Sequence, residues 1–131
     1  MKQEKRQTEV DTNLGDVEAK FADIVWKAAP MQTAELVEIC ARELGWKRTT
    51  TYTVLKKFCN KNVFSVEQGR ISVLVSREEF YGLKSEKFVE KTFGGSLPAF
   101  LSAFISVKKI SEEEIEEIKK IISDFHTPMP S

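Results

Sequence analysis

The sequence predicts a mainly α-helical protein with one small β-hairpin. Three observations lead to this fold class. Apolar residues recur at helical spacing in three successive segments before residue 61, two short segments with β-type alternation flank Gln68-Gly69, and helical spacing returns after Arg77 and continues to Phe125. With 131 residues, 41% of them hydrophobic, the chain can bury one core of ordinary size or two small ones.

The sequence has no stretch long and apolar enough for a membrane helix, and no cysteine framework. The longest uncharged apolar stretch, residues 97–107, is far shorter than the roughly 20 residues that a membrane helix needs, and residues 1–12 lack an apolar signal core. We therefore expect a cytoplasmic protein. Cys40 and Cys59 lie on apolar helical runs without a second Cys or His at metal-ligand spacing, so we expect both to be buried helical residues.

The first two helices follow a polar N-terminal segment. Residues 1–13 are charged and show no periodicity, which predicts a flexible tail without regular structure. Apolar residues at helical spacing then predict a helix over residues 17–28, which ends before Pro30. A second helix is expected to begin after Thr33 as its N-cap and to end at Gly45.

A third helix is predicted from about Arg48 to Asn60. One of its faces is apolar and the other is basic and aromatic, which is the pattern of a helix packed on a core by one side. The face that we expect to be buried consists of Thr51, Val54, Leu55 and Phe58.

A β-hairpin is predicted directly after the third helix. Asn62 can take the left-handed conformation that ends a helix, and the strands 63–67 and 71–76 are joined by Gln68-Gly69. Three helices followed by a hairpin are the order of a winged helix-turn-helix domain, which we place at residues 14–77.

The remaining chain is predicted to be an all-helical dimerisation region over residues 78–126, followed by a short tail at 127–131. Gly94-Gly95 breaks the helical pattern, and Ser111 with Glu114 forms a capping-box sequence that opens the last helix. About 50 residues cannot bury six phenylalanines and an isoleucine stripe alone, so we expect a second copy of the chain as the partner. The expected dimerisation residues are Phe88, Phe100, Phe104, Ile115, Ile118 and Ile122.

Charge is distributed unevenly although the formal net charge is zero. From Arg42 to Arg70, seven basic residues stand against two acidic ones, a local charge of +5. From Ile110 to His126, six acidic residues stand against two basic ones, a local charge of −4. A basic middle and an acidic end indicate two surfaces with different roles.

The outer face of the third helix carries the residue types that a DNA-reading helix needs. Such a helix presents short polar or long basic side chains to base edges and phosphates while its other face anchors it. Two alternatives remain: a basic face that is only solvated, and a protein-interaction module that uses this face on an acidic partner. Arg70 in the hairpin could enter a minor groove, clamp a phosphate or be an ordinary exposed turn residue. The candidate DNA-binding residues are Lys47, Arg48, Thr49, Thr50, Tyr52, Thr53, Lys56, Lys57 and Arg70.

The sequence offers no grouping of residues for catalysis, a metal or a cofactor. His126 is the one histidine and lies beside two prolines near the C-terminus. The acidic run from Glu112 to Glu117 has the capping box and apolar spacing of a solvated helix face. No glycine-rich phosphate loop occurs. We therefore expect a binding protein that is not an enzyme.

The order of these motifs resembles the penicillinase-repressor family of bacterial regulators, the BlaI/MecI type, over roughly residues 14 to 125. Each motif alone is weak, but their order is specific. The resemblance rests on Ile24-Val25-Trp26 with Pro30 just after it, Thr33-Ala34, Trp46 with Thr50 and Thr53, Gly69-Arg70, Phe93-Gly94-Gly95-Ser96-Leu97, Ala103-Phe104 and the run from Ile110 to Glu117.

The resemblance implies a homodimeric repressor that binds double-stranded palindromic operator DNA through the third helix and the hairpin. Thr50, Thr53 and Lys57 fall where the family places Thr, Thr and Arg. In several members a membrane-bound sensor with a metalloprotease domain triggers cleavage in the dimerisation region, at a bond that aligns with Ala103-Phe104. Cleavage then weakens the dimer and releases DNA.

The sequence departs from the family pattern at three places. Lys47 replaces the usual small N-cap of the third helix, and Asn62 replaces a glycine. The hairpin's second strand, residues 71–74, lacks the aromatic residues common in the family. Copper-responsive members carry a cysteine cluster near the C-terminus, but no cysteine follows Cys59 here, so we expect no copper sensing by that route.

Overall fold

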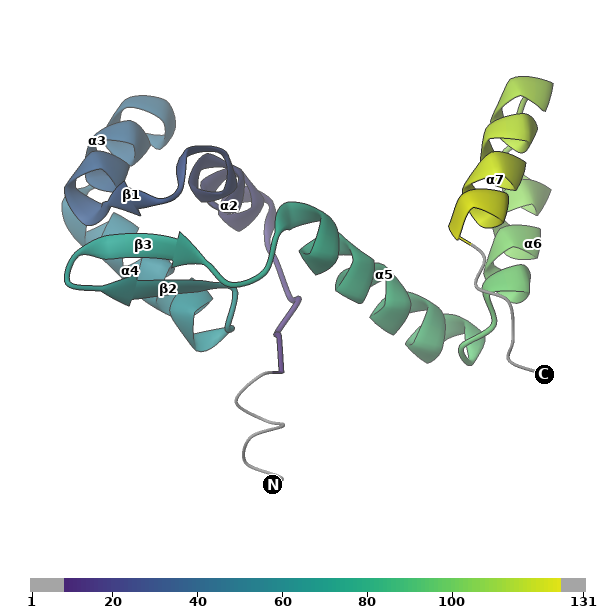
Figure 1. Cartoon of the computed structure of the whole chain (residues 1–131), viewed down its shortest axis with the longest axis horizontal. Coiled ribbons are helices and arrows are strands. Elements are labelled where there is room, and N and C mark those ends of the chain that lie inside the picture. The colour runs from purple at the N-terminus through teal and green to yellow at the C-terminus, as the bar shows by residue number, and fades with distance from the viewer. Residues whose placement is uncertain (1–8, 126–131) are drawn as a thin grey trace. The chain divides into compact units, whose positions relative to one another are not determined.

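A computed structural model describes residues 9–125 and confirms the predicted fold class. The chain consists mainly of helices with one small antiparallel sheet (Figure 1). Contacts within the chain divide it into two units, residues 1–87 and 88–131. Helix α5 (Arg77–Phe93) begins at the boundary expected from the sequence and continues past Lys87 without a break.

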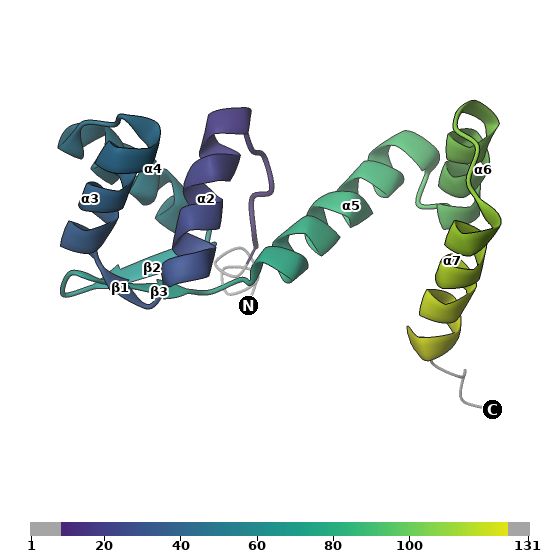
Figure 2. The ribbon, with the colours of Figure 1, turned by 90° about the horizontal axis from the view of Figure 1, so that it is seen from above.

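The first unit has the predicted order of helices and hairpin. Seen from above, its helices lie on one side of the sheet (Figure 2). Helix α3 (Thr33–Leu44) ends at Gly45 (φ 68°) and Asn62 is left-handed (φ 65°), both as predicted. Thr33, however, is the first residue of α3, and Gln32 is its N-cap. The elements before α5 are α2 (Asp16–Ala28), β1 (Met31–Gln32), α3 (Thr33–Leu44), α4 (Arg48–Asn60), β2 (Phe64–Glu67) and β3 (Arg70–Val73).

Phenylalanine rings form the centre of the first unit's core. Phe21 of α2, Phe58 of α4 and Phe64 of β2 are fully buried. The ring of Phe58 lies 5.4 Å from that of Phe21 and 5.3 Å from that of Phe64, between centroids. Trp46 stacks on Phe21 at 5.7 Å. Such aromatic pairs stabilise beyond the area that they bury, so the turn before α4 and the body of α4 are both fixed to α2.

The sheet has three strands in the order β1-β3-β2, all antiparallel. Two residues are too few to show an alternation, so the sequence pattern does not predict β1. Strand β3 ends at Val73, three residues before the predicted end. The reason is a change of hydrogen bonding, because the N–H groups of Leu74 and Val75 both donate to the carbonyl of Val63.

Residues 9–13 correct the expectation of a flexible tail. They have no regular secondary structure, but Thr12 is only 5% exposed and the Asp11 N–H donates to the Lys61 carbonyl at 3.1 Å. Side chains far away in the sequence donate to the carbonyls of this segment, which is a kind of contact that local periodicity cannot reveal. The donors are Asn62 to Glu9, Lys87 to Val10, Lys84 to Thr12 and Lys61 to Asn13.

The second unit contains the last turns of α5, helix α6 (Leu97–Val107) and helix α7 (Glu112–Phe125), and α6 and α7 lie side by side (Figure 1, Figure 2). The predicted capping box is present, since Ser111 Oγ accepts from the Glu114 N–H at 3.1 Å and the Glu114 carboxylate accepts from the Ser111 N–H. Between Phe88 and Phe125 no side chain is fully buried. The large apolar side chains exposed there are Phe88, Leu97, Phe104, Ile105, Val107, Ile115, Ile121, Ile122 and Phe125.

Candidate nucleic-acid interface

Helix α4 is held in place by one face, as predicted. Thr51, Val54, Leu55 and Phe58 are all buried. The Thr51 hydroxyl donates back to the carbonyl of Lys47 at 3.3 Å, across the first turn of the helix. Lys47 is the N-cap residue, and its side chain makes no capping hydrogen bond. The anchored face therefore leaves the other side of α4 open to solvent.

The exposed side of α4 has a centre and two flanks. At 3.6 residues per turn, Thr49, Thr53 and Lys56 lie opposite the buried face. Arg48 and Tyr52 lie on one flank, and Thr50 and Lys57 lie on the other. Together with Lys47 and Arg70, these are the predicted DNA-binding residues, and each of them is exposed.

One flank is ordered by a cation–π contact. The guanidinium carbon of Arg48 lies 5.5 Å from the ring centroid of Tyr52, one helical turn later. Such a contact holds the aromatic ring and the cation together while both remain partly solvated. This flank therefore presents a planar aromatic surface next to a fixed positive charge.

The other flank carries an ion pair that sequence reasoning missed. Lys57 Nζ lies 3.4 Å from Glu18 Oε2 of α2. The pKa of Glu18 lies below its ordinary value, first because the Gly15 N–H donates to the carboxylate, and further because Lys57 and Lys61 are close, whereas partial burial acts in the opposite direction. Glu18 and Lys57 are 39 residues apart in sequence, so no local spacing indicates the pair.

The hairpin is fixed at its tip to the start of α3. Gln68 (φ 52°) and Gly69 (φ 78°) form the turn, as their sequence predicts. The Gly69 carbonyl accepts a hydrogen bond from the Thr33 N–H at 2.8 Å. Arg70 pairs with Glu67 on one side and with Gln32 on the other, and its side chain is exposed. The tip thus carries an exposed arginine on a supported turn.

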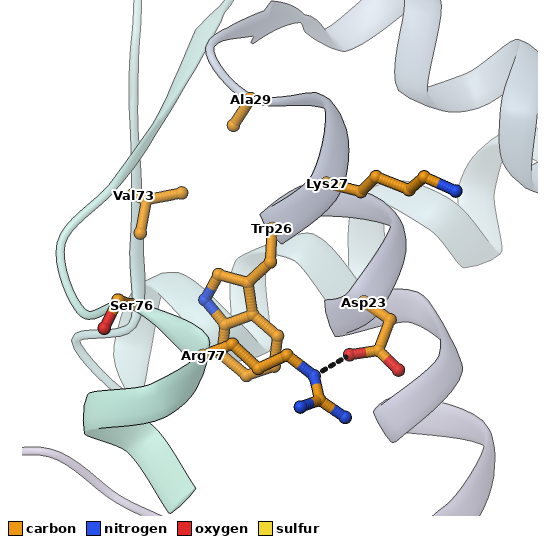
Figure 3. Close-up of a pocket in the computed structure, with 7 residues that line it drawn as sticks. All are labelled: Asp23, Trp26, Lys27, Ala29, Val73, Ser76 and Arg77. Carbon is orange, nitrogen blue, oxygen red and sulfur yellow. Dashed lines mark hydrogen bonds and ion pairs between the residues drawn. The ribbon is translucent and has the colours of Figure 1, made fainter.

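A pocket of about 550 Å³ lies near the junction of α2, β3 and α5 (Figure 3). Asp23 and Arg77 line it and are already paired with each other, at 2.9 Å between Oδ1 and Nε. The Trp26 indole N–H donates to the Val75 carbonyl at 2.9 Å. These contacts anchor the first turn of α5. The lining residues are Asp23, Trp26, Lys27, Ala29, Val73, Ser76 and Arg77.

The cysteines have the environment of packed side chains. Cys40 is buried as predicted, whereas Cys59 is only half-buried. Burial raises the pKa of both thiols, which disfavours the reactive thiolate form.

No group of His, Cys, Asp and Glu within residues 9–125 is placed to hold a metal ion, and His126 lies outside these residues. In the same part of the chain, no helix is long and apolar enough to cross a membrane.

The residues predicted to dimerise lie in the second unit and are at most half-buried. Phe88 is 51% exposed, Phe104 is 45% exposed and Ile122 is 57% exposed. Phe100 and Ile118 are half-buried, and the Phe100 ring packs edge-on against that of Phe88 at 6.1 Å. The exposed pair Ala103-Phe104, where cleavage is expected from the sequence, lies inside α6.

Comparisons with known proteins agree with this arrangement. The sequence profile of the penicillinase repressor family matches residues 14–124. The chain is also 23% identical to the penicillinase repressor of Bacillus licheniformis over 115 residues, which are 85% of this chain and 90% of that protein. The match covers all helices and strands described here except the last residue of α7. The chain belongs to the penicillinase repressor family.

Proposed function

We propose that this protein is a homodimeric transcriptional repressor that binds a palindromic operator in double-stranded DNA through α4 and the hairpin. The observation that carries the proposal is the exposed side of α4, where threonines, a tyrosine and basic residues cover a helix anchored by a buried face. Helices of this kind read base edges in the major groove while neighbouring basic groups contact phosphates. Membership in a repressor family supports the same role.

Each part of the exposed side has a chemical role in this proposal. Lys56, at the centre, contacts a phosphate, and Thr49 and Thr53 contact phosphates or a thymine methyl group. Arg48 and Tyr52 contact the backbone or a base on one flank. Arg70 at the hairpin tip contacts the backbone or enters the minor groove.

The dependence of binding on salt tests the DNA interface. Loss of one phosphate contact reduces the slope of log affinity against log salt by about 1 per site, so Lys56→Ala should bind duplex DNA more weakly and with a smaller slope. Lys120→Ala, on the polar side of α7, removes the same charge far from the proposed interface in sequence and is the control. An affinity and slope of Lys56→Ala equal to those of the control would refute this interface, and binding to an acidic protein but to no duplex would indicate an interaction module instead.

The second unit supports dimerisation. Many of its large apolar side chains are exposed in the protomer. A groove of about 530 Å³ between α6 and α7 is lined by five apolar residues and two lysines, and two of the five, Ile105 and Ile115, are exposed while the other three are half-buried. Contiguous apolar surfaces of this kind mark association sites, and in a twofold-symmetric dimer each copy would cover the apolar surface of the other. The lining residues are Leu101, Ile105, Lys109, Ile110, Ile115, Ile118 and Lys119.

We further propose that cleavage at Ala103-Phe104, triggered by a membrane-bound sensor protease, releases the repressor from DNA. Two DNA-binding units in one dimer make the second half-site contact effectively intramolecular, and a cut in the dimerisation unit removes that gain. Because the bond lies in a helix, a protease reaches it only after local opening. Mass spectrometry of the repressor from its host, before and after cell-wall antibiotic stress, tests this: a fragment ending at Ala103 is expected, and an intact chain while target genes are induced would exclude the mechanism.

A further inference from the structure

We propose that Glu18 is a positioning residue that holds Lys57 back from DNA and thereby weakens the phosphate contact made by one flank of α4. The inference rests on the proposed function, since it presupposes that α4 binds duplex DNA. Glu18 belongs to a different helix, and it is not among the residues expected to contact DNA.

The geometry keeps the Glu18 carboxylate directed at α4. Its Oε1 accepts a hydrogen bond from the Gly15 N–H at 3.3 Å, within the capping box of α2. Its Oε2 lies 3.4 Å from Lys57 Nζ. The Glu18 side chain is 25% exposed, whereas that of Lys57 is 57% exposed. A carboxylate tied to the backbone by one oxygen is therefore a fixed partner, and the lysine is the mobile one.

The lysines near Lys57 differ in whether groups of the protein already engage them. Lys56 lies at the centre of the exposed side, and the structure of residues 9–125 shows no ion pair for it. Lys61, one turn after Lys57, donates to the Asn13 carbonyl and lies over the Phe58 ring. On this flank, therefore, both lysines are engaged by groups of the same unit before any DNA arrives.

DNA binding requires Lys57 to exchange partners. When Lys57 turns to a phosphate, it gives up its contact with Glu18, and the carboxylate is left beside a second anion. Exposed ion pairs contribute little to stability but their loss still opposes binding, and like charges disfavour association. Removing the Glu18 charge should therefore strengthen binding, by about two- to fivefold at low salt.

The variant Glu18→Gln isolates this effect. The glutamine carbonyl oxygen can still accept from the Gly15 N–H, so the cap of α2 is retained while the charge is lost. Asp16→Asn is the matched control, because it removes one negative charge from the first turn of the same helix at a residue for which the described structure shows no ion pair. The same substitution in a Lys57→Met background shows whether the effect passes through Lys57.

The assay uses full-length protein and a fluorescein-labelled duplex of arbitrary sequence, because phosphate contacts dominate binding to any duplex. Anisotropy titrations from about 50 to 200 mM NaCl give affinity and slope. We expect Glu18→Gln to bind about two- to fivefold more tightly, with a steeper salt slope, and to lose most of this gain in the Lys57→Met background. A merely structural role of Glu18 would not steepen the slope.

Each of the remaining outcomes contradicts either this inference or the proposed function. If the wild type binds with the expected salt dependence but Glu18→Gln is unchanged or weaker, the inference fails and the proposed function stands. An equal gain in Asp16→Asn, or an undiminished gain without Lys57, would show a general charge effect and would also overturn it. If the wild type shows no salt-dependent binding, the proposed function itself fails.

Discussion

Replacement of Ile122 by aspartate should separate the proposed dimer into folded protomers. Ile122 lies on the apolar side of α7 with Ile115 and Ile118, and it is 57% exposed in the protomer. An aspartate there remains hydrated as long as the chain is alone, so α7 should persist. In a dimer that covers this face, the same carboxylate would be removed from water.

The size of the effect follows from the exposed fraction. Covering the exposed 57% of an isoleucine contributes about 1 to 2 kcal/mol, and burial of an unpaired carboxylate costs a few kcal/mol more. A twofold-symmetric dimer contains the site twice. The dissociation free energy should therefore fall by roughly 5 to 8 kcal/mol, which raises the dissociation constant at least about a thousandfold.

Sedimentation velocity over a range of micromolar concentrations measures this change. Ser123→Asp is the matched control, because it adds the same charge at the next residue of α7, about 100° around the helix from Ile122 and outside the apolar stripe. We expect a dimer for the wild type and the control and a monomer with unchanged helix content for Ile122→Asp. A wild type that is monomeric, or an Ile122→Asp protein as dimeric as the wild type, would refute the reasoning.

Three further predictions concern the first unit. Trp26→Phe removes the indole hydrogen bond to a backbone carbonyl and should lower the free energy of unfolding by about 1 kcal/mol in urea titrations, so an unchanged value would contradict this anchor. Asn62→Gly keeps the positive φ but loses the hydrogen bond to the Glu9 carbonyl, so hydrogen exchange of the Asp11 amide should accelerate about fivefold. Unaltered exchange would mean that contacts other than the Asn62 side chain hold residues 9–13. The folded-state pKa of Glu18 lies below its ordinary 4.5, so the stabilisation by its carboxylate is present above pH 4.5 and is lost as the pH falls through the folded-state pKa. The difference in free energy of unfolding between wild type and Glu18→Gln should therefore shrink on acidification. A difference that stays constant would contradict the lowered pKa.

The elements that sequence patterns predicted well are those with strong local signals. Helix α4 begins and ends at the predicted residues and buries the predicted face, because its apolar positions repeat over three turns. Gly45, Asn62 and Gly69 have the positive φ values that their residue types tolerate. Local chemistry alone determines these features.

The features that were missed depend on contacts between distant parts of the chain. The two-residue strand β1 exists because it pairs with β3, and residues 9–13 are held by donors 48 to 77 residues away. The presence of Asn62 where the family has glycine has a structural correlate of the same kind. Its side chain donates to Glu9 at 2.7 Å, a contact that glycine cannot make.

The different burial of the two units has a consequence for regulation. The first unit has its own core, but between Phe88 and Phe125 no side chain is fully buried, so in the proposed dimer most of the stability of α6 and α7 would come from the second copy. Local opening of α6 around Ala103 should then be frequent in monomers and rare in dimers. A protease acting there would cleave the monomer preferentially and draw the dimer apart by mass action. Hydrogen exchange of α6 amides should therefore slow down as the protein concentration rises through the dimer dissociation constant, whereas exchange independent of concentration would mean that α6 is stable without its partner.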